Sequence, residues 1–564
     1  MKLASSSLSI ILLSQCTPAA AFFPTKGLVQ QSFKSQIISS GSTVVLHKPQ
    51  CATALQMSIP SIINTVQRPR IAACALAFLL LAVKVVRDPR AFFWPGAGVD
   101  SQSKAALPEG SLGCPFVGYD IFSGSKDYGP FAKLGQLSKK NGKIFKIYSY
   151  GYPLVSVSGV DNIKSLLKNE FKDDGIGTFM IGKQNIGKIF GENMLLYENN
   201  NEKHSMLRRL MGTAMTPGAI AAGIPSIQER ANYHINEMLK TNQAVKFEDA
   251  FQSFTLDIAW KQILGLDLKE EEIPKFHDAV RDWTDGMLNP FFLVPFKVPG
   301  LEKYTKAGRA ATYLRGKIEE KISKLEKDGP DSSTLSKLYY ATDEDGTRLT
   351  REQVIDNSLL LIFAGTETSA STLRCAALFL TLHPDVWNKV RAEQNEIKAK
   401  YGDDLTSEAL ENSVYLDAVI KETLRLQPVE LGELRKVKES VVVDGKQIPK
   451  KWYAFFNAKQ THYNDPSTYQ EDGSHMDHFK GFKPDRWLSE STKPKEWMPF
   501  GDGRRRCIGE RLGMTEMKVF LSMLARKVAK CELVNTIDAD HEIVWQKGNA
   551  MARPANAECT LVAA

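Results

Sequence analysis

The first 87 residues contain no aspartate and no glutamate, although they hold eight lysines and arginines. The rest of the chain carries 64 basic and 64 acidic residues, so its formal net charge is zero. A neutral body argues against a general polyanion binder, and nucleic acid is not an expected partner.

The sequence also lacks a CxxC pair. Its eight cysteines are scattered over 564 residues, which argues against a disulfide framework.

The acid-free leader has two parts. Residues 1–21 contain one lysine, an apolar stretch and a terminal Ala19-Ala20-Ala21, the layout of a signal peptide with a small-residue cleavage site. Phe22 follows directly, and residues 22–70 are basic and Ser/Thr-rich, as transit peptides are. Together they resemble the bipartite leaders of algae with complex plastids, such as diatoms. An ordinary secretory signal followed by a spacer is the alternative, with the endoplasmic reticulum as location.

A long membrane-spanning run is also lacking. Residues 71–83 are uninterruptedly apolar, and the run reaches Val86 if Lys84 turns its amine to the interface. Sixteen helical residues reach only ~24 Å, less than the ~30 Å of a hydrocarbon core. We therefore expect a single-pass or monotopic anchor over 71–86, a linker over 87–106 and a catalytic domain over 107–564.

The body shows no internal repeat and many helical patterns. Expected helices are 128–140, 227–239, 247–264, 303–327, 351–382, 384–400, 407–426 and 509–529. Expected strands are short: 145–148, 154–157, 440–443, 454–456 and 543–544. This layout predicts one large, mainly α domain with small β-sheets early and late, rather than a doubly wound α/β sheet.

Residues 500–509 read FGDGRRRCIG and place three arginines before one thiol in a glycine-rich loop. Helical periodicity resumes after Gly509, so Cys507 should lie just before a helix N-terminus, where backbone N–H groups favour a thiolate. Such a thiolate could be a nucleophile or a metal ligand. A cysteine thiolate can also hold haem iron, and the haem propionates need arginine partners. The arginine cluster could therefore both lower the thiol pKa and hold the cofactor.

The pattern Phe500-x-x-Gly503-x-Arg505-x-Cys507-x-Gly509 resembles the haem-binding signature of the cytochrome P450 family. Three further patterns stand in the family's order. They are Ala364-Gly365-Thr366-Glu367-Thr368-Ser369 (the oxygen-activation stretch), Glu422-x-x-Arg425 (the ExxR motif) and the segment around Arg486. The resemblance covers about residues 107–564. It implies a single large cytochrome P450 fold, with haem b between the long central helix and the cysteine loop.

The physical properties of the residues in these motifs agree with the roles that the resemblance implies. Glu422 and Arg425 lie i, i+3 on one helix face and can pair, and with Arg486 they would form a buried network near the haem. Gly365 costs about 1 kcal/mol in a helix interior relative to alanine. This cost suggests a kinked helix where O₂ and water must fit. A solvated surface pair and a small-residue packing site are the respective alternatives.

The resemblance assigns roles to further residues. His204, Arg208, Arg435 and Arg505 would reach the haem propionates, and Ala364, Gly365, Phe500 and Gly509 would also contact the cofactor. Cys507 would be the axial ligand of the iron. Arg504, Arg506 and Arg511 lie outside the signature's fixed positions and would form a positive patch for an acidic electron donor.

The implied reaction is monooxygenation with O₂, in which Glu367 and Thr368 relay protons. No flavin or iron–sulfur motif is visible, so electrons would come from ferredoxin in a plastid or from NADPH-cytochrome P450 reductase at the reticulum.

The apolar stretch 287–296 could form a mobile roof or ordinary core. By analogy with the sterol-, retinoid- and terpenoid-oxidising branch, the substrate would be a lipophilic isoprenoid-derived molecule. Repeated oxidation of a methyl group to a carboxylate is one form of that reaction.

Two competing functions remain open. One is a haem-thiolate isomerase or dehydratase that does not use O₂, and the other is a non-catalytic haem-binding protein. Retention of Glu367 and Thr368 favours monooxygenation over the first, and the weakened helix at Gly365 favours it over the second. His475 and His478 resemble half of a zinc site, but no further ligands stand at useful spacing, so a solvated loop is the preferred interpretation.

Overall fold

The computed structural model describes residues 92–121, 132–149, 151–178, 183–241, 243–286, 297–430, 432–469, 472–473, 481–534, 543, 545, 553–555 and 557–564. The chain divides into two units, Met1–Phe93 and Trp94–Ala564. The predicted signal, transit-like and anchor segments over 1–86 lie outside the described residues. Part of the predicted linker belongs to the second unit, because Ala97 is buried and Trp452 Nε1 donates a hydrogen bond to Gly98 O at 2.7 Å.

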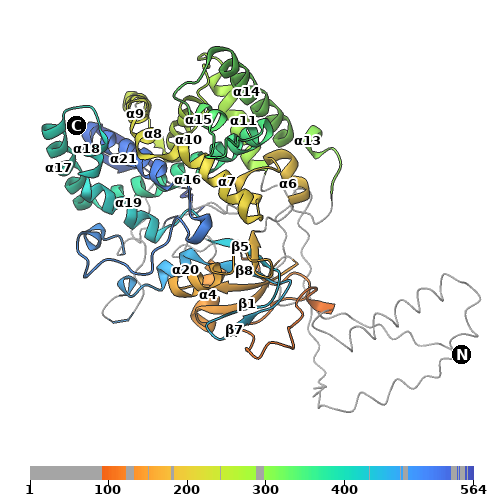
Figure 1. Ribbon diagram of the computed structural model, residues 1–564. Helices are drawn as coiled ribbons and strands as arrows, with labels where there is room; N and C mark the ends of the chain where they lie inside the picture. The colour runs from red at the N-terminus through yellow and green to blue at the C-terminus, as the bar shows by residue number, and fades with distance from the viewer. Residues whose placement is uncertain are drawn as a thin grey trace, which may run out of the picture. The chain divides into compact units, whose positions relative to one another are not determined.

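The second unit is mainly helical (Figure 1). Its longer helices are α4 (Ala132–Asn141), α5 (Val160–Leu167), α6 (Lys183–Phe190), α7 (Asn201–Gly212), α9 (Ile224–Lys240), α10 (Phe247–Ile258), α11 (Ile273–Asp285), α14 (Lys306–Asp328), α16 (Arg351–Leu382), α17 (Pro384–Tyr401), α19 (Val414–Leu426) and α21 (Glu510–Lys527). Its shorter ones are α8 (Pro217–Ala221), α13 (Leu301–Tyr304), α15 (Thr334–Tyr340), α18 (Ser407–Glu411) and α20 (Ala458–Tyr463).

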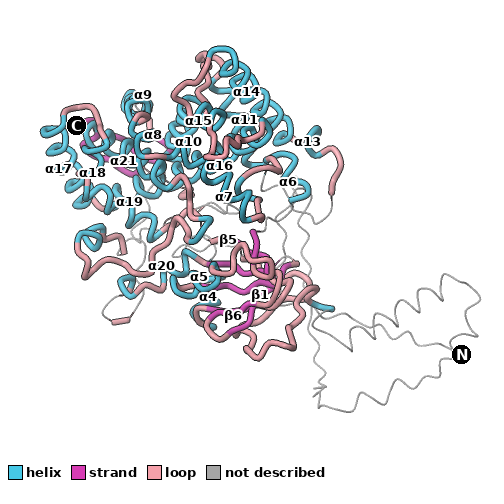
Figure 2. Tube along the Cα trace, in the orientation of Figure 1, coloured by secondary structure: helices cyan, strands magenta, loops and turns pink. Residues whose placement is uncertain are grey.

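The strands form three small sheets. They are β1 (Ile144–Ser149), β2 (Tyr152–Val157), β3 (Ile176–Thr178), β4 (Val245–Lys246), β5 (Glu433–Val437), β6 (Val441–Val443), β7 (Lys446–Ile448), β8 (Tyr453–Phe456), β9 (Val528–Leu533) and β10 (Glu558–Ala563). The largest sheet has the order β1-β2-β8-β5-β3. Figure 2 shows α4, α5 and α20 beside it, whereas the β9–β10 pair lies apart, near α17 and α21. The predicted mainly α fold with small sheets is confirmed.

The central helix α16 organises the helical part. A capping box begins it, in which Gln353 N–H donates to Thr350 Oγ1 at 3.2 Å and Thr350 N–H donates to Gln353 Oε1 at 2.9 Å. Its N-terminal half packs in one hydrophobic cluster with α11, α14 and α15, and its C-terminal half packs in a second with α9, α10, α19 and α21. Because both clusters share α16, most of this helix is buried on every side.

Most predicted helices are present, with different ends. The helix expected over 351–382 has those bounds in the structure, whereas the one expected over 407–426 is two helices, α18 and α19. The helix expected over 247–264 finishes in a π-helical turn, Ala259–Ile263. Among the described residues, no single helix is long and apolar enough to cross a membrane. Two helices that meet at a 43° bend, Asn201–Met215 and Pro217–Lys240, pass that criterion only when taken together.

Candidate active site

Cys507 stands at the end of a loop that folds back on itself. Its backbone N–H donates to Phe500 O at 2.9 Å, and the N–H of Arg506 donates to Gly503 O at 3.2 Å. Gly503 has φ +70°, a conformation that glycine adopts readily. The helix α21 begins at Glu510, so the thiol lies just before a helix N-terminus, as its periodicity predicts.

The thiol is accessible, yet its surroundings are those of an interior. Cys507 is exposed, but burial raises the pKa of its thiol, while the Gly509 N–H and the charge of Arg208 act in the opposite direction. The expectation that the arginine cluster lowers this pKa is therefore wrong. Burial is the largest cause of the raised pKa, and the charge of Glu510, to which Arg506 Nε donates at 2.8 Å, acts in the same direction.

A short stretch of the central helix α16 is also accessible, although most of this helix is buried. Ala364 is exposed, and Phe363, Gly365 and Thr368 are partly exposed, although the helix is otherwise buried on both sides of them. Five residues after Ala364, Ser369 Oγ donates to Glu516 Oε2 on α21 at 3.2 Å. Since α21 starts directly after the cysteine loop, this contact holds the loop and the accessible stretch of α16 close together.

Glu367 and Thr368 have different surroundings. Thr368 Oγ1 donates to Ala364 O one turn back, and α16 continues unbroken through Gly365, so the structure shows no break at this glycine. Glu367 is buried and accepts hydrogen bonds from Gln252 Nε2 and Arg553 Nη2, both at 2.5 Å. In this conformation the carboxylate is therefore engaged by two other residues, and a proton relay through the pair remains a prediction.

Residues predicted to hold the propionates gather beside the loop. His204 and Arg208 lie one turn apart on α7, and Arg208 Nη2 donates to Arg506 O at 2.6 Å. Burial, with the charges of Arg505 and Arg208, lowers the pKa of His204 to about 4. His204 is therefore neutral at pH 7, and the positive charge at this place comes from the arginines.

Arg435 has a crowded environment. It is buried on β5, and its guanidinium donates to Glu170 Oε1 and, at 2.7 Å, to Glu433 Oε2. Glu170 Oε1 also lies 3.8 Å from Arg505 Nε, so one carboxylate is shared between two predicted propionate partners. The role predicted for Arg435 toward a propionate is not tested by these contacts.

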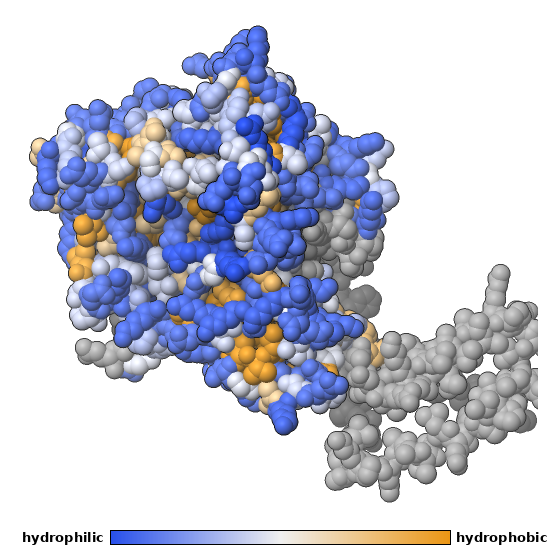
Figure 3. Space-filling model, in the orientation of Figure 1, coloured by the Kyte–Doolittle hydropathy of each residue, from blue (hydrophilic) through white to orange (hydrophobic). Residues whose placement is uncertain are grey.

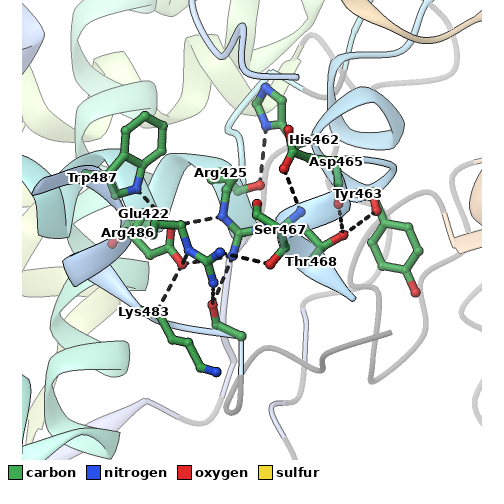
Figure 4. Close-up of polar contacts among 12 residues, drawn as sticks. Glu422, Arg425, His462, Tyr463, Asp465, Ser467, Thr468, Lys483, Arg486 and Trp487 are labelled. Carbon is green, nitrogen blue, oxygen red and sulfur yellow. Dashed lines mark hydrogen bonds and ion pairs between the residues drawn. The ribbon is translucent and has the colours of Figure 1, made fainter. Parts of the chain in front are cut away.

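Glu422, Arg425 and Arg486 meet in one buried network (Figure 4). Glu422 accepts from Arg425 Nε at 2.9 Å and Nη2 at 2.8 Å, and from Arg486 Nε at 3.0 Å. The network also receives the Lys483 N–H and the Trp487 Nε1–H, both at 2.9 Å from Glu422. These donors lower the pKa of Glu422 against the effect of burial, so the carboxylate is held in its charged form.

Sequence reasoning missed His462, which links this network to the cysteine loop. Its Nε2 accepts the Met498 N–H at 2.8 Å, and its Nδ1 lies 3.3 Å from Arg425 O. Burial and the charge of Arg425 lower the pKa of His462 to about 3, so the ring is neutral with its proton on Nδ1. A lone histidine in a sequence gives no signal of such a role, because both partners are backbone atoms from distant segments.

Two sequence observations lie outside the described residues. The apolar stretch 287–296 and the histidines of GSHMDH, His475 and His478, are not described by the structure. Their predicted roles therefore stay predictions.

Comparison with known proteins shows which family this chain belongs to. The family description for cytochrome P450 matches residues 108–552, which is most of the chain. The chain belongs to the cytochrome P450 family. Cytochrome P450 26A1 of Xenopus laevis is 27% identical over 448 residues, covering 77% of this chain and 87% of the relative. Cytochrome P450 26B1 of Danio rerio is 26% identical over 471 residues, covering 81% and 87%.

A solved P450 structure shares the fold. "Retinoic acid bound cyanobacterial CYP120A1" has 25% sequence identity and a TM-score of 0.68, and the match covers 82% of this chain and all of that one. The protein is a cytochrome P450 monooxygenase whose cofactor is haem b, and its reaction uses O₂, a lipophilic substrate and a redox partner. The residues present fit this cofactor, because an accessible thiol lies beside a cluster of cationic side chains. Cys507 would hold the iron, and Arg208 and Arg505 would face the propionates.

Proposed function

We propose that this cytochrome P450 hydroxylates a lipophilic, isoprenoid-derived small molecule. When bound, haem b supplies the activation of O₂. The observation that carries the proposal is the accessible thiol of Cys507, held close to the accessible stretch of α16 around Ala364. The solved neighbour has retinoic acid bound, which supports an isoprenoid-type substrate. Successive oxidation of one methyl group to a carboxylate is a form of the reaction that we include in the proposal.

Glu367 and Thr368 are the proposed proton donors of the reaction. A hydroxyl beside a carboxylate can hold a water molecule and pass a proton to the reacting oxygen. Thr368 is partly exposed at the accessible stretch, which supports this role, whereas Glu367 is engaged by Arg553 and Gln252. For a relay, the carboxylate must exchange one of these contacts for a water molecule.

The proposed electron donor is an acidic protein, either ferredoxin or a flavoprotein reductase. Arg504, Arg506 and Arg511 stand on or beside the cysteine loop, where positive charge would attract an acidic partner. Arg504 and Arg506 are exposed, although Arg506 already pairs with Glu510. We therefore expect Arg504 to contribute more than Arg506 to donor binding.

We further propose that the protein is anchored to a membrane through residues 71–86, in the plastid of an alga with complex plastids. The acid-free leader supports this location. Figure 3 shows hydrophobic surface over the sheet-containing part of the second unit, while most of the helical part is hydrophilic. Phe116 and Val117, in the segment after the predicted linker, have 52% and 54% of their surface exposed and suit contact with a lipid interface.

The decisive test uses purified full-length protein, with Cys507→Ser as the matched variant. The reduced, CO-bound protein should absorb near 450 nm, a family expectation, and the variant should lose this band. Lipophilic extracts and isoprenoid standards are then screened for shifts of the haem Soret band, and binders are incubated with O₂, NADPH and an added reductase. We expect a product with one additional oxygen atom that forms only when the reductase is present.

Each competing function predicts a different result. An isomerase or dehydratase would convert its substrate without reductase and without O₂. A non-catalytic haem protein would bind ligands and form no product. Persistence of the 450 nm band in Cys507→Ser would show that Cys507 is not the iron ligand, and the proposal would then fail at its first step.

A further inference from the structure

Two of the free cysteines are neighbours on one small sheet. Cys531 lies on β9 and Cys559 lies on β10, and these strands pair in an antiparallel ladder near the end of the chain. In this ladder Cys531 is opposite Leu561, and Cys559 is opposite Leu533. Residues directly opposite each other share a face of the sheet, and so do residues two apart on one strand. The two cysteines are therefore diagonal neighbours whose side chains lie on the same face.

This face of the sheet packs against the hydrophobic core. Cys559 is fully buried in the cluster that α9, α10 and α21 share, and Cys531 packs against that cluster with part of its surface accessible. On the opposite face of β9, Lys530 and Glu532 are exposed and form an ion pair. The burial pattern therefore places both thiols on the inner face, as the register does.

The two thiols are in contact. A hydrogen bond joins the side chains of Cys559 and Cys531, and this bond, followed by burial, raises the pKa of Cys559. The ladder shifts register between Val562 and Ala563, and such an irregularity increases the local twist. Twisted strands cross at an angle, which shortens one of the two diagonals between neighbouring pairs. A contact between diagonal neighbours is thus a consequence of how these two strands pair.

The thiols differ in reactivity toward an external disulfide. The thiolate is the nucleophile, and the raised pKa of Cys559 keeps that buried group protonated. Cys531, which has accessible surface, would therefore attack first: its thiolate breaks the S–S bond of the reagent, forms a mixed disulfide and releases one thiolate. The sulfur of Cys531 then carries no charge, so the repulsion that helps to hold the proton on Cys559 is removed.

Cys559 would complete the exchange. It loses its proton, attacks the Cys531 sulfur of the mixed disulfide and releases the second thiolate of the reagent. One S–S bond forms in the protein and one breaks in the reagent. The reagent takes up two electrons and the protons of both cysteines, and it leaves as two thiols.

The strand that carries Cys559 holds the C-terminal segment in place. It is the middle strand of its sheet, between β4 and β9, and β9 directly follows α21. Just before this strand, Ala557 O accepts the Phe247 N–H at the start of α10 at 3.1 Å, and Arg553 donates to Glu367 on α16. A covalent link between β9 and β10 would therefore fix the segment that also reaches the central helix.

We propose that Cys531 and Cys559 are a reversible redox pair: exchange with a small or protein disulfide joins them, and the new bond fixes strand β10 to strand β9. Cys531 reacts first and Cys559 resolves the mixed disulfide. The bond closes a loop between residues 28 positions apart, which restricts the unfolded chain and stabilises the folded one. The inference concerns thiols other than Cys507 and does not rest on the proposed function.

The test compares haem-loaded full-length protein treated with dithiothreitol or with glutathione disulfide. Free thiols are then alkylated, and trypsin, which cuts after Lys530 and Lys547, leaves the two cysteines in different peptides, 531–547 and 548–564. After treatment with glutathione disulfide we expect these two peptides joined, with a mass two hydrogen atoms below their sum. Dithiothreitol should separate them again.

Two further measurements report the effect of the bond on the fold. The melting temperature should rise on oxidation, and amide hydrogen exchange over β10 should slow at least about tenfold. Both changes should be absent in Cys531→Ser, whose partly exposed site tolerates a hydroxyl, and in Cys559→Ala. Cys114→Ser, at a partly buried cysteine of another segment, is the matched control and should still give the joined peptides. The 450 nm band should be the same before and after oxidation.

Three outcomes would overturn the inference. The first is a mixed disulfide of glutathione on Cys531 that does not proceed to the joined peptides. The second is a bond between cysteines of two copies of the chain, seen as a dimer without reductant. The third is formation of the joined peptides with unchanged hydrogen exchange over β10, which would show that the bond does not fix the strand.

Discussion

Arg553 Nη2 donates to Glu367 Oε2 at 2.5 Å, so a residue near the C-terminus is tied to the middle of the central helix. Both side chains are largely buried, with 14% and 4% of their surface exposed. Arg374 Nη1 lies 3.9 Å from the same carboxylate oxygen, and Arg553 Nη1 lies 3.7 Å from Glu248 Oε1. The carboxylate predicted to relay protons therefore also organises a buried charge network that joins α16, α10 and the C-terminal segment.

Removal of Arg553 should destabilise the fold. Arg553→Leu leaves the buried Glu367 charge partly uncompensated, and breaking a buried pair in this way costs about 3–5 kcal/mol. Chemical denaturation should report this loss of unfolding free energy, and a second substitution, Glu367→Gln, should recover part of it. Arg351→Leu is the control, because the Arg351–Glu326 pair is half-exposed at both side chains and should contribute at most about 1 kcal/mol. Equal losses in the two arginine variants would contradict this prediction.

Removal of a charge from the Glu422 network should destabilise the fold as much as removal of Arg553. Glu422→Gln keeps the shape of the side chain but removes the charge that Arg425 and Arg486 share, and we expect a loss of about 3–5 kcal/mol. A lower yield of haem-containing protein and a lower melting temperature would record it. The control is Glu490→Gln, whose carboxylate is 89% exposed and contacts only Lys493 among the described residues. A Glu422→Gln protein with wild-type melting temperature would show that the network does not support the fold.

His462 should make stability depend on pH. Its pKa is about 3 in the folded protein, below the ordinary value of 6.5, so the folded state binds fewer protons than the unfolded state between these values. The contribution is fully present above pH 6.5 and is lost as the pH falls toward 3. His462→Gln cannot titrate, so its melting temperature should fall less than that of the wild type between pH 7 and pH 5. Parallel curves for the two proteins would exclude His462 as a source of acid sensitivity.

Thr368→Ala should impair the oxygen chemistry and leave the fold unchanged. Alanine is the better helix former, and the lost hydroxyl donates only to Ala364 O, so haem content should stay near that of the wild type. Product formed per electron consumed should fall and hydrogen peroxide should rise. General acid contributions are typically ~10²–10⁴-fold, and we expect the lower end or less, since water can substitute for the hydroxyl. Unchanged coupling here and in Glu367→Gln would show that the pair is structural.

The leader prediction concerns residues outside those that the structure describes. Residues 1–70 fused to a fluorescent protein should reach the plastid of a diatom host, and Phe22→Asp should keep the fusion outside it. Fluorescence of the unmutated fusion at the endoplasmic reticulum would support the secretory alternative. Deletion of residues 1–106 should give a more soluble protein that binds haem, although the buried Ala97 and the contact between Trp452 and Gly98 predict some loss of stability.

The sequence by itself determined the family, the mainly α fold and the position of the cysteine. These features follow from local patterns: a glycine-rich loop needs particular backbone angles, and a buried helix needs an uninterrupted run of suitable residues, as at α16. The i, i+3 spacing of Glu422 and Arg425 likewise fixes their pairing within one helix. Several strands, such as β5 and β9, were not predicted, because strand pairing depends on segments far apart in the chain.

Only the tertiary structure decided which charges meet. The bonds from Arg553 to Glu367 and from Met498 N–H to His462 join segments 186 and 36 residues apart, and no local pattern encodes them. The pKa of Cys507 shows the same limit, because burial raises it and outweighs the charge of Arg208, and burial is a property of everything packed around the thiol.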